Sequence, residues 1–265
     1  MSANVVRLND VADERLTPFR DIRERDLRRR DELFVAEGTV VLRMLAASDV
    51  FSAHAILVLE NRLEGIRDIV AAFADDVPAY VVSREVIDAI AGFPMHRGVL
   101  ALAKWTRKPT VAELLARSPR RLLVLCGLSN HDNVGGCFRA ASAFGVDGVL
   151  LDQSCADPLY RKAIRVSAGA ALIVPFAVGG GALDLLRSVR DVGIEVTALT
   201  PSATSTIEKL DRTQSRALVI GSEGEGLPAS VLSEFPTARI RMAAGHDSLN
   251  AATCAAVALY ALSDH

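Results

Sequence analysis

Three short stretches in the second half of the chain hold the residues with the clearest chemical potential. In the first, residues 130–145, Arg139 stands six residues after Asn133 on a predicted helix of mainly small and apolar side chains. Asp132 or Asn133 would cap this helix and Gly145 would end it. A guanidinium on such a helix must reach solvent, pair with an acid or face a cleft. The spacing alone leaves two explanations open for Arg139, a functional role in a cleft and a structural ion pair.

The second stretch, residues 221–228, reads Gly-Ser-Glu-Gly-Glu-Gly-Leu-Pro and follows an apolar run that predicts a strand. Ligands of open α/β sheets bind at the carboxyl ends of strands, and three glycines in six residues leave backbone groups accessible there. Glu223 and Glu225 would repel a phosphate, and the Lys-Ser/Thr ending of a Walker loop is missing. The pattern predicts a binding loop that is not a phosphate cradle, with a plain glycine turn as the alternative.

The third stretch, residues 245–250, leads into a final segment, 249–262, of small or apolar residues. Ser248 is a good helix N-cap, and His246 is best explained as a loop histidine. Asn250 would lie inside an apolar helix, where a buried amide needs partners for its donor and its acceptor. We expect this helix to be buried, and its small side chains would permit close approach by another backbone, a ligand or a partner subunit.

Two arginine-rich segments could contact a polyanion. Arg161, Lys162 and Arg165 fall within five residues, and Arg28 and Arg29 belong to a run of seven arginines between residues 15 and 30. Both segments could contact phosphates, although solvated helix faces are the commoner explanation for such runs.

Alternating apolar runs and helical patterns predict an α/β protein with two domains. In residues 1–108 we expect a small α/β domain, with helices at 37–47, 62–73 and 84–91 and strands at 55–59, 79–82 and 98–104. Residues 109–119 are predicted as a linker. Residues 120–265 contain apolar runs at 122–126, 148–151, 172–176, 195–199, 217–221 and 238–242. Such runs, with helices between most of them, predict a parallel sheet covered on both faces.

Composition narrows the class of protein. The 265 residues are 50% hydrophobic and carry 30 basic and 32 acidic side chains, a balance that excludes a disordered chain and a strongly basic nucleic-acid-binding domain. The four cysteines, at 126, 137, 155 and 254, lack metal-site spacing, so we expect no metal. The N-terminus lacks a signal-peptide core, and the apolar runs are too short to span a bilayer. We therefore expect a cytoplasmic protein with no membrane partner.

Taken in order, these stretches resemble the SpoU/TrmH family of the SPOUT class of RNA methyltransferases. The similar motifs are residues 133–145, 221–227 and 240–250, with Arg165-Val166-Ser167-Ala168-Gly169 and the Leu199-Thr200 strand end in addition. The resemblance covers about residues 120–262. The preceding region, with Glu37-Gly38 and the segment 96–99, is similar to the L30e-like RNA substrate-binding domain of many members.

The resemblance implies a C-terminal trefoil knot, a homodimer, and transfer of methyl from S-adenosylmethionine to a ribose 2′-hydroxyl in tRNA or rRNA. General connection rules alone would predict an unknotted sheet. The residues expected at the cofactor are Leu199, Thr200, Gly221, Ile240, Met242 and Leu249. The expected catalytic residues are Arg139, Asn133, Glu223, Ser248 and Asn250. Arg161, Lys162, Arg165, Arg28 and Arg29 are the expected RNA contacts.

Two residues depart from the family pattern beside the expected adenosine pocket. Relatives usually have proline where Arg241 stands and valine where Ala251 stands. We expect Arg241 to point away from the pocket or toward RNA phosphate. Two alternatives remain open: an RNA-binding, ribosome-associated protein of the same fold that has lost turnover, and a dinucleotide-dependent oxidoreductase, which the missing glycine fingerprint disfavours.

Overall fold

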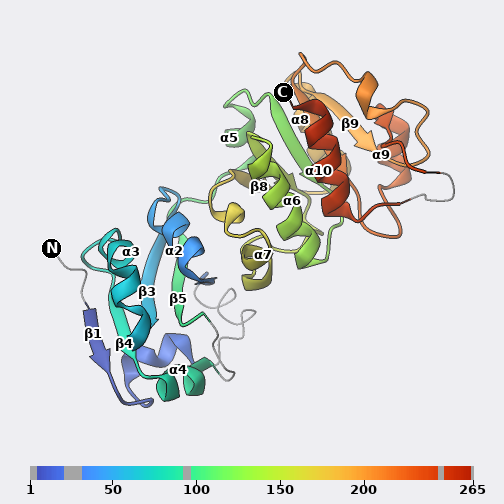
Figure 1. Ribbon diagram of the computed structural model, residues 1–265. Coiled ribbons are helices and arrows are strands. Elements are labelled where there is room, and N and C mark those ends of the chain that lie inside the picture. The colour runs from blue at the N-terminus through green and yellow to red at the C-terminus, as the bar shows by residue number, and fades with distance from the viewer. Residues whose placement is uncertain (1–4, 21–31, 92–96, 244–247, 264–265) are drawn as a thin grey trace. The chain divides into compact units, whose positions relative to one another are not determined.

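A computed structural model describes residues 5–20, 32–91, 97–243 and 248–263, arranged as two compact units (Figure 1). Unit 1 comprises Met1–Lys108 and Leu159–Arg165, and unit 2 comprises Pro109–Pro158 and Val166–His265. The segment 109–119, predicted as a linker, is part of unit 2, because its helix α5 (Val111–Leu115) buries Leu114 and Leu115 in that unit's core. The excursion of residues 159–165 to unit 1 was not predicted.

Unit 1 is a mixed five-stranded sheet with strand order β1-β4-β3-β5-β2. Strands β1, β4 and β3 run parallel, while β5 is antiparallel to both β3 and β2. Helices α2 and α3 lie over one face, and α4 packs with the 3₁₀ turn η1 against the other (Figure 1). The bounds are β1 Val5–Leu8, η1 Glu14–Phe19, β2 Phe34–Glu37, α2 Thr39–Ala46, β3 Phe51–Leu59, α3 Arg67–Ala71, β4 Ala79–Val82, α4 Arg84–Ala91 and β5 Val99–Trp105.

Strands β1 and β2, at the two edges of the sheet, were not predicted, and β2 includes Glu37, where a helix was predicted to begin. The predicted helix 62–73 is also too long. The chain there forms two 3₁₀ turns, Glu60–Arg62 and Glu64–Ile66, before the short α3 begins.

Unit 2 is a six-stranded sheet in which all the strands are parallel, with order β11-β9-β10-β6-β7-β8. This confirms the predicted parallel sheet. The bounds are β6 Arg121–Leu125, β7 Gly148–Leu151, β8 Phe176–Val178, β9 Glu195–Leu199, β10 Arg216–Ile220 and β11 Thr237–Ala238. Their apolar residues are almost all buried, as expected when helices cover both faces.

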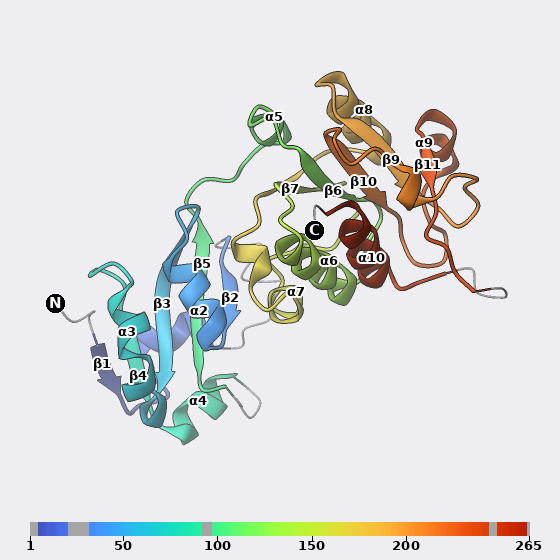
Figure 2. The same cartoon turned by 45° about the horizontal axis from the view of Figure 1, so that its top comes forward.

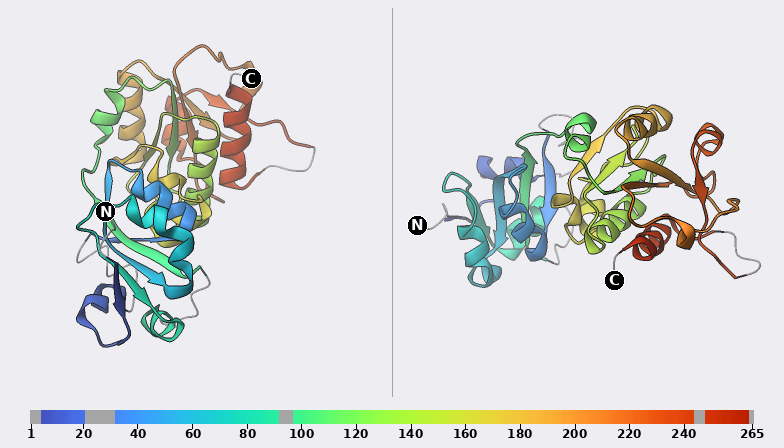
Figure 3. Two further views of the ribbon diagram at one scale, coloured as in Figure 1. Left: turned by 60° about the vertical axis from the view of Figure 1, so that its left-hand side comes forward. Right: turned by 90° about the horizontal axis from the view of Figure 1, so that it is seen from above.

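The helices of unit 2 form two layers around this sheet (Figures 2 and 3). Helices α5, α8 (Ala182–Asp191) and α9 (Ala229–Glu234) pack on one face. Helices α6 (His131–Ala143) and α10 (Ala251–Leu262) lie side by side on the other. The predicted close approach to the last helix is present: a Cβ atom on Gly136 of α6 would lie 2.5 Å from the Cβ of Ala252 on α10. Helix α7, Arg161–Val166, belongs to unit 1 except for its last residue.

Two strand predictions in unit 2 are wrong. Residues 170–172 form a 3₁₀ turn, and β8 begins only at Phe176, after Pro175, which has no N–H to give to a ladder. The predicted strand 238–242 is only the end of β11, and residues 239–242 are irregular. No helix within the described ranges is both long enough and apolar enough to cross a membrane.

Candidate active site

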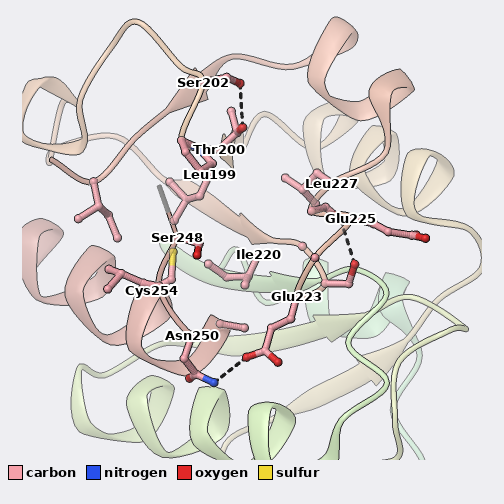
Figure 4. A pocket seen from close by; sticks show the side chains of 18 of the residues that line it. Leu199, Thr200, Ser202, Ile220, Glu223, Glu225, Leu227, Ser248, Asn250 and Cys254 are labelled. Atoms are coloured by element: carbon pink, nitrogen blue, oxygen red, sulfur yellow. Dashed lines mark hydrogen bonds between the residues drawn. The ribbon is translucent and has the colours of Figure 1, made fainter. Parts of the chain in front are cut away.

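A cavity of about 740 Å³ lies at the carboxyl ends of β9 and β10 and beside the segment that follows β11 (Figure 4). Three distant stretches meet there: the end of β9, the loop after β10, and a third stretch that contributes residues 240 and 242 and the segment 248–254. The six residues expected to hold a cofactor, Leu199, Thr200, Gly221, Ile240, Met242 and Leu249, all line it. Glu223, Ser248 and Asn250 line it as well.

The loop after β10 is a tight hairpin that folds back on the strand end. Gly226 N–H donates to the Ser222 carbonyl at 3.1 Å, and the Ser222 hydroxyl donates to the Gly226 carbonyl at 3.3 Å. A Cβ atom on Gly221 would lie 2.5 Å from the carbonyl carbon of Gly226 and 2.6 Å from the nitrogen of Leu227. Glycine is therefore required at position 221 for the hairpin to close against the cavity.

Asn250 connects this hairpin to helices α6 and α10. Its side-chain oxygen caps α10 by accepting from the N–H groups of Ala252 (3.0 Å) and Thr253 (3.3 Å). Its Nδ2 donates to Asn133 Oδ1 at 2.8 Å. The same group donates to Glu223 Oε1 at 2.7 Å (Figure 4). The cap fixes which end of the amide faces the helix, so the NH₂ group must face the two acceptors. Asn250, and not Ser248 as predicted, is thus the N-cap.

Helix α6 begins at a different cap from the predicted ones. The side chain of Asn130 accepts from the Asp132 N–H at 2.8 Å, which leaves Asn133 inside the first turn, buried and bonded to Asn250. At the other end Gly145 has φ +62°, and Val146 N–H donates to the Ala141 carbonyl at 2.9 Å. The predicted glycine ending of this helix is confirmed.

Arg139 is exposed on α6 and is not among the residues that line the cavity. Within the described residues it has no hydrogen-bond or ion-pair partner. The ion-pair explanation for this arginine therefore has no support in the described part of the chain. A solvent-facing guanidinium six residues, or about 1.7 turns, beyond Asn133 remains able to hold a phosphate.

Comparison with known proteins identifies the family of this chain. The model of the SpoU rRNA Methylase family matches residues 120–260, which is more than half of the chain. An uncharacterized tRNA/rRNA methyltransferase of Mycobacterium tuberculosis H37Rv is 38% identical over 260 residues, covering 95% of this chain and 89% of that protein. The chain belongs to the SpoU rRNA methylase family.

Solved structures have the same fold over nearly the whole chain. The AdoMet-bound rRNA methyltransferase from Sinorhizobium meliloti superposes with a TM-score of 0.80 at 22% identity, covering 97% of both chains. A protein described as an RNA 2′-O ribose methyltransferase has a TM-score of 0.75 at 25% identity, covering 97% of this chain and 98% of its own. Both units of the chain, and not only the family-matching part, therefore have counterparts in these structures.

The two departures from the family pattern lie on different sides of the cavity wall. Arg241 is exposed, does not line the cavity, and its Nε donates to Glu208 Oε1 at 3.1 Å. This guanidinium is turned away from the cavity, as expected. Ala251 is buried and lines the cavity as the first residue of α10.

The ionisable side chains that line the cavity are few. Among the described lining residues only Glu223 and Glu225 carry charge, and both are negative. Cys254 also lines it, and burial raises the pKa of its thiol to about 11, so this group is neutral at physiological pH. The cavity therefore has one sign of charge, and no described cation balances it.

The residues expected to contact RNA have different surroundings. Arg161 donates from Nε and Nη2 to the buried carboxylate of Glu37 at 3.0 and 2.8 Å, within unit 1. That contact gives Arg161 a structural role, because an unpaired buried carboxylate is costly. Lys162 and Arg165 are exposed. Arg28 and Arg29 lie outside the described residues.

Several residues that line the cavity, including Ser202 and Cys254, were not predicted from the sequence. The hydroxyls of Thr200 and Ser202 lie 3.0 Å apart at the end of β9, on the opposite side of the cavity from Asn250 (Figure 4). The Thr-Pro-Ser sequence directly after an apolar strand was the available signal. No sequence signal pointed to Cys254, because a cysteine among alanines is typical of a buried helix.

Proposed function

We propose that this protein transfers a methyl group from S-adenosylmethionine to the ribose 2′-hydroxyl of a nucleotide in tRNA or rRNA. The observation that carries the proposal is that the second and third family motifs line one cavity with the Leu199-Thr200 strand end, while Asn133 of the first motif is hydrogen-bonded to Asn250 of the third. Arg139, on the same helix as Asn133, has no partner among the described residues. Membership of the SpoU family and the named activities of its relatives support it. We include a cytoplasmic location in the proposal, consistent with four free cysteines.

The cavity fits S-adenosylmethionine in size and chemistry. Its volume of about 740 Å³ lies in the usual range for small-molecule sites. Leu199, Ile240 and Leu249 offer apolar walls to an adenine ring, and the hairpin at Gly221 exposes backbone groups for its polar edge. Two carboxylates suit a cationic ligand better than an anionic one. When bound, S-adenosylmethionine supplies an electrophilic methyl group, and the rest of the mechanism belongs to the protein and the RNA.

Arg139 is assigned to the RNA side of the reaction. Guanidinium donates hydrogen bonds and does not act as a base at neutral pH, so Arg139 holds an RNA phosphate and stabilises the negative charge that develops on the 2′-oxygen. The proton of the hydroxyl passes to that phosphate or to water. Asn133, Glu223 and Asn250 hold α6, the hairpin and α10 in one arrangement, and Ser248 lies at the cavity where the ribose would enter. Orientation of this kind lowers reaction barriers substantially.

RNA binding is proposed to depend on exposed cations, and the described candidates are Lys162 and Arg165 in addition to Arg139. We further propose a homodimer, because α10 exposes Val257 and Tyr260 at 38% and 59% on a helix otherwise rich in small residues. We also propose that unit 1 is an L30e-like RNA-binding domain and that unit 2 contains a trefoil knot. RNA affinity should fall as salt concentration rises, since phosphate contacts release counterions.

The deciding experiment incubates the full chain with methyl-labelled S-adenosylmethionine and separated tRNA and rRNA pools. The labelled RNA is then hydrolysed with alkali. A methylated 2′-oxygen cannot attack its neighbouring phosphate, so the label should appear in alkali-resistant dinucleotides. Label in mononucleotides would mean base methylation and would overturn the ribose assignment. Absence of label in every pool, with the donor bound, would instead favour a binding protein without turnover.

A further inference from the structure

The negative charge of the cavity favours positively charged ligands. Of its two acidic residues, Glu223 is the one whose position is fixed. Its Oε1 accepts a 2.7 Å hydrogen bond from Asn250, and the Asn250 amide is itself held by its cap on α10. Figure 4 shows Glu223 turned toward the start of α10, while Glu225 extends away from it. A held carboxylate keeps its charge at one place in the cavity, whereas a free side chain does not.

A methyl donor loses one positive charge when it reacts, and this inference rests on the proposed function above. S-adenosylmethionine carries a sulfonium, an ammonium and a carboxylate, for a net charge of about +1. Transfer breaks the bond from sulfur to the methyl carbon and forms a bond from that carbon to the 2′-oxygen, whose proton leaves to phosphate or water. The product, S-adenosylhomocysteine, has a neutral sulfur and no net charge. A fixed carboxylate therefore attracts the donor more than the product.

We propose that Glu223 is a specificity-determining residue that makes the cavity favour the charged methyl donor over its demethylated product. No described lysine, arginine or histidine lines the cavity to cancel this effect, and the Cys254 side chain is a neutral thiol. Glu223 thus has two separable roles. Its oxygen anchors the hairpin to Asn250, and its charge sorts donor from product, which limits inhibition by the product.

The test compares Glu223→Gln with the wild type by calorimetric titration of the full chain. Glutamine keeps an oxygen that can accept from Asn250 and removes the charge. The ligands are S-adenosylmethionine, S-adenosylhomocysteine and sinefungin, in which an amine-bearing carbon supplies a positive charge at the place of the sulfonium. We expect Glu223→Gln to weaken both cationic ligands by about three- to tenfold and to leave S-adenosylhomocysteine unchanged. Because Glu223 is exposed, the wild-type preference should also shrink at high salt.

Two variants serve as controls. Glu223→Asp keeps the charge and should keep the preference for cationic ligands, even if the shorter side chain weakens all three. Asp191→Asn removes an exposed acid at the end of α8, away from the cavity, and should change no affinity. Equal weakening of the three ligands by Glu223→Gln, or no weakening at all, would overturn the inference. A wild-type protein that binds none of them would also refute the proposed cofactor, so the two failures are distinguishable.

Discussion

The two charged residues assigned to catalysis, Glu223 and Arg139, lie in opposite kinds of surroundings. Glu223 is hydrogen-bonded to Asn250, which also holds Asn133 and caps α10. Arg139 lies on the same helix as Asn133 but has no partner among the described residues. The difference indicates that the cavity side of the site is organised before any ligand arrives. Under the proposed function, an RNA phosphate that binds Arg139 would complete the other side of the site.

Arg139→Ala gives the largest expected loss. Without the guanidinium the 2′-oxygen loses its electrostatic stabilisation, so kcat should fall by about 100- to 1,000-fold. The dissociation constant of S-adenosylmethionine should stay within about twofold, because Arg139 does not line the cavity. Single-turnover methylation and calorimetry measure the two quantities. An undiminished rate would refute the role of Arg139, and lost donor affinity would refute the separation of the two sides.

Gly221→Ala tests the cavity side. The new Cβ would lie about 2.5 Å from backbone atoms of Gly226 and Leu227, which cannot move without opening the hairpin. We expect donor affinity to fall at least about tenfold and the free energy of unfolding to fall by about 1–3 kcal/mol. Gly180→Ala is the matched control, since its Cβ would meet nothing within 4 Å. Titration and thermal unfolding of both variants decide the point, and equal behaviour would contradict the structural role of Gly221.

Asn250→Ala should have a smaller effect on stability, of about 0.5–2 kcal/mol, from the loss of the α10 cap. It also leaves the buried Asn133 oxygen without its described donor, so kcat should fall together with stability. Ser248→Ala is the comparison, because Ser248 was the predicted cap and is not the observed one. Urea unfolding should show a change for Asn250→Ala only. A destabilised Ser248→Ala variant would mean that the capping assignment is wrong.

The sequence predicted where the site lies better than it predicted which of its residues are hydrogen-bonded to one another. Glycines and acids after a strand predicted a binding loop at residues 221–228, and the family resemblance added the six expected cofactor residues, all of which line the cavity. The cap of α10 was mispredicted because serine is locally as good as asparagine. What decides between Ser248 and Asn250 is the second end of the amide, which binds Asn133 and Glu223 from distant parts of the chain.

The fold shows the same division between local and long-range information. Strands β4 and β7 and helix α4 were predicted with their observed bounds, because each has a clear local pattern. The edge strands β1 and β2 were missed, and the segment 159–165 was not expected to join unit 1, where Arg161 meets the buried Glu37. Such long-range pairings leave no period in the sequence. Because ion pairs between distant residues leave no local pattern, the sequence could not show whether Arg139 would have a partner.

Cys254→Ser gives the smallest expected effect and tests whether the cavity contains a reactive nucleophile. Burial raises the pKa of this thiol from 9.0 to about 11, so at neutral pH its thiolate fraction is about 100-fold lower than that of an ordinary cysteine. A thiolate could be methylated by the donor in place of the RNA, whereas a protonated thiol is not nucleophilic enough to react. We therefore expect Cys254→Ser to change kcat and donor affinity by less than about twofold.

Alkylation of wild-type Cys254 by iodoacetamide, followed by mass spectrometry, sharpens this test. The alkylation rate should rise about tenfold per pH unit up to about pH 11, because the thiolate is the reactive form and the folded protein keeps the thiol protonated below that pH. S-adenosylhomocysteine should slow the reaction, since Cys254 lines the cavity. Fast alkylation at pH 7 would mean that the Cys254 thiol is activated. The cavity would then contain a reactive nucleophile, which contradicts the expected result.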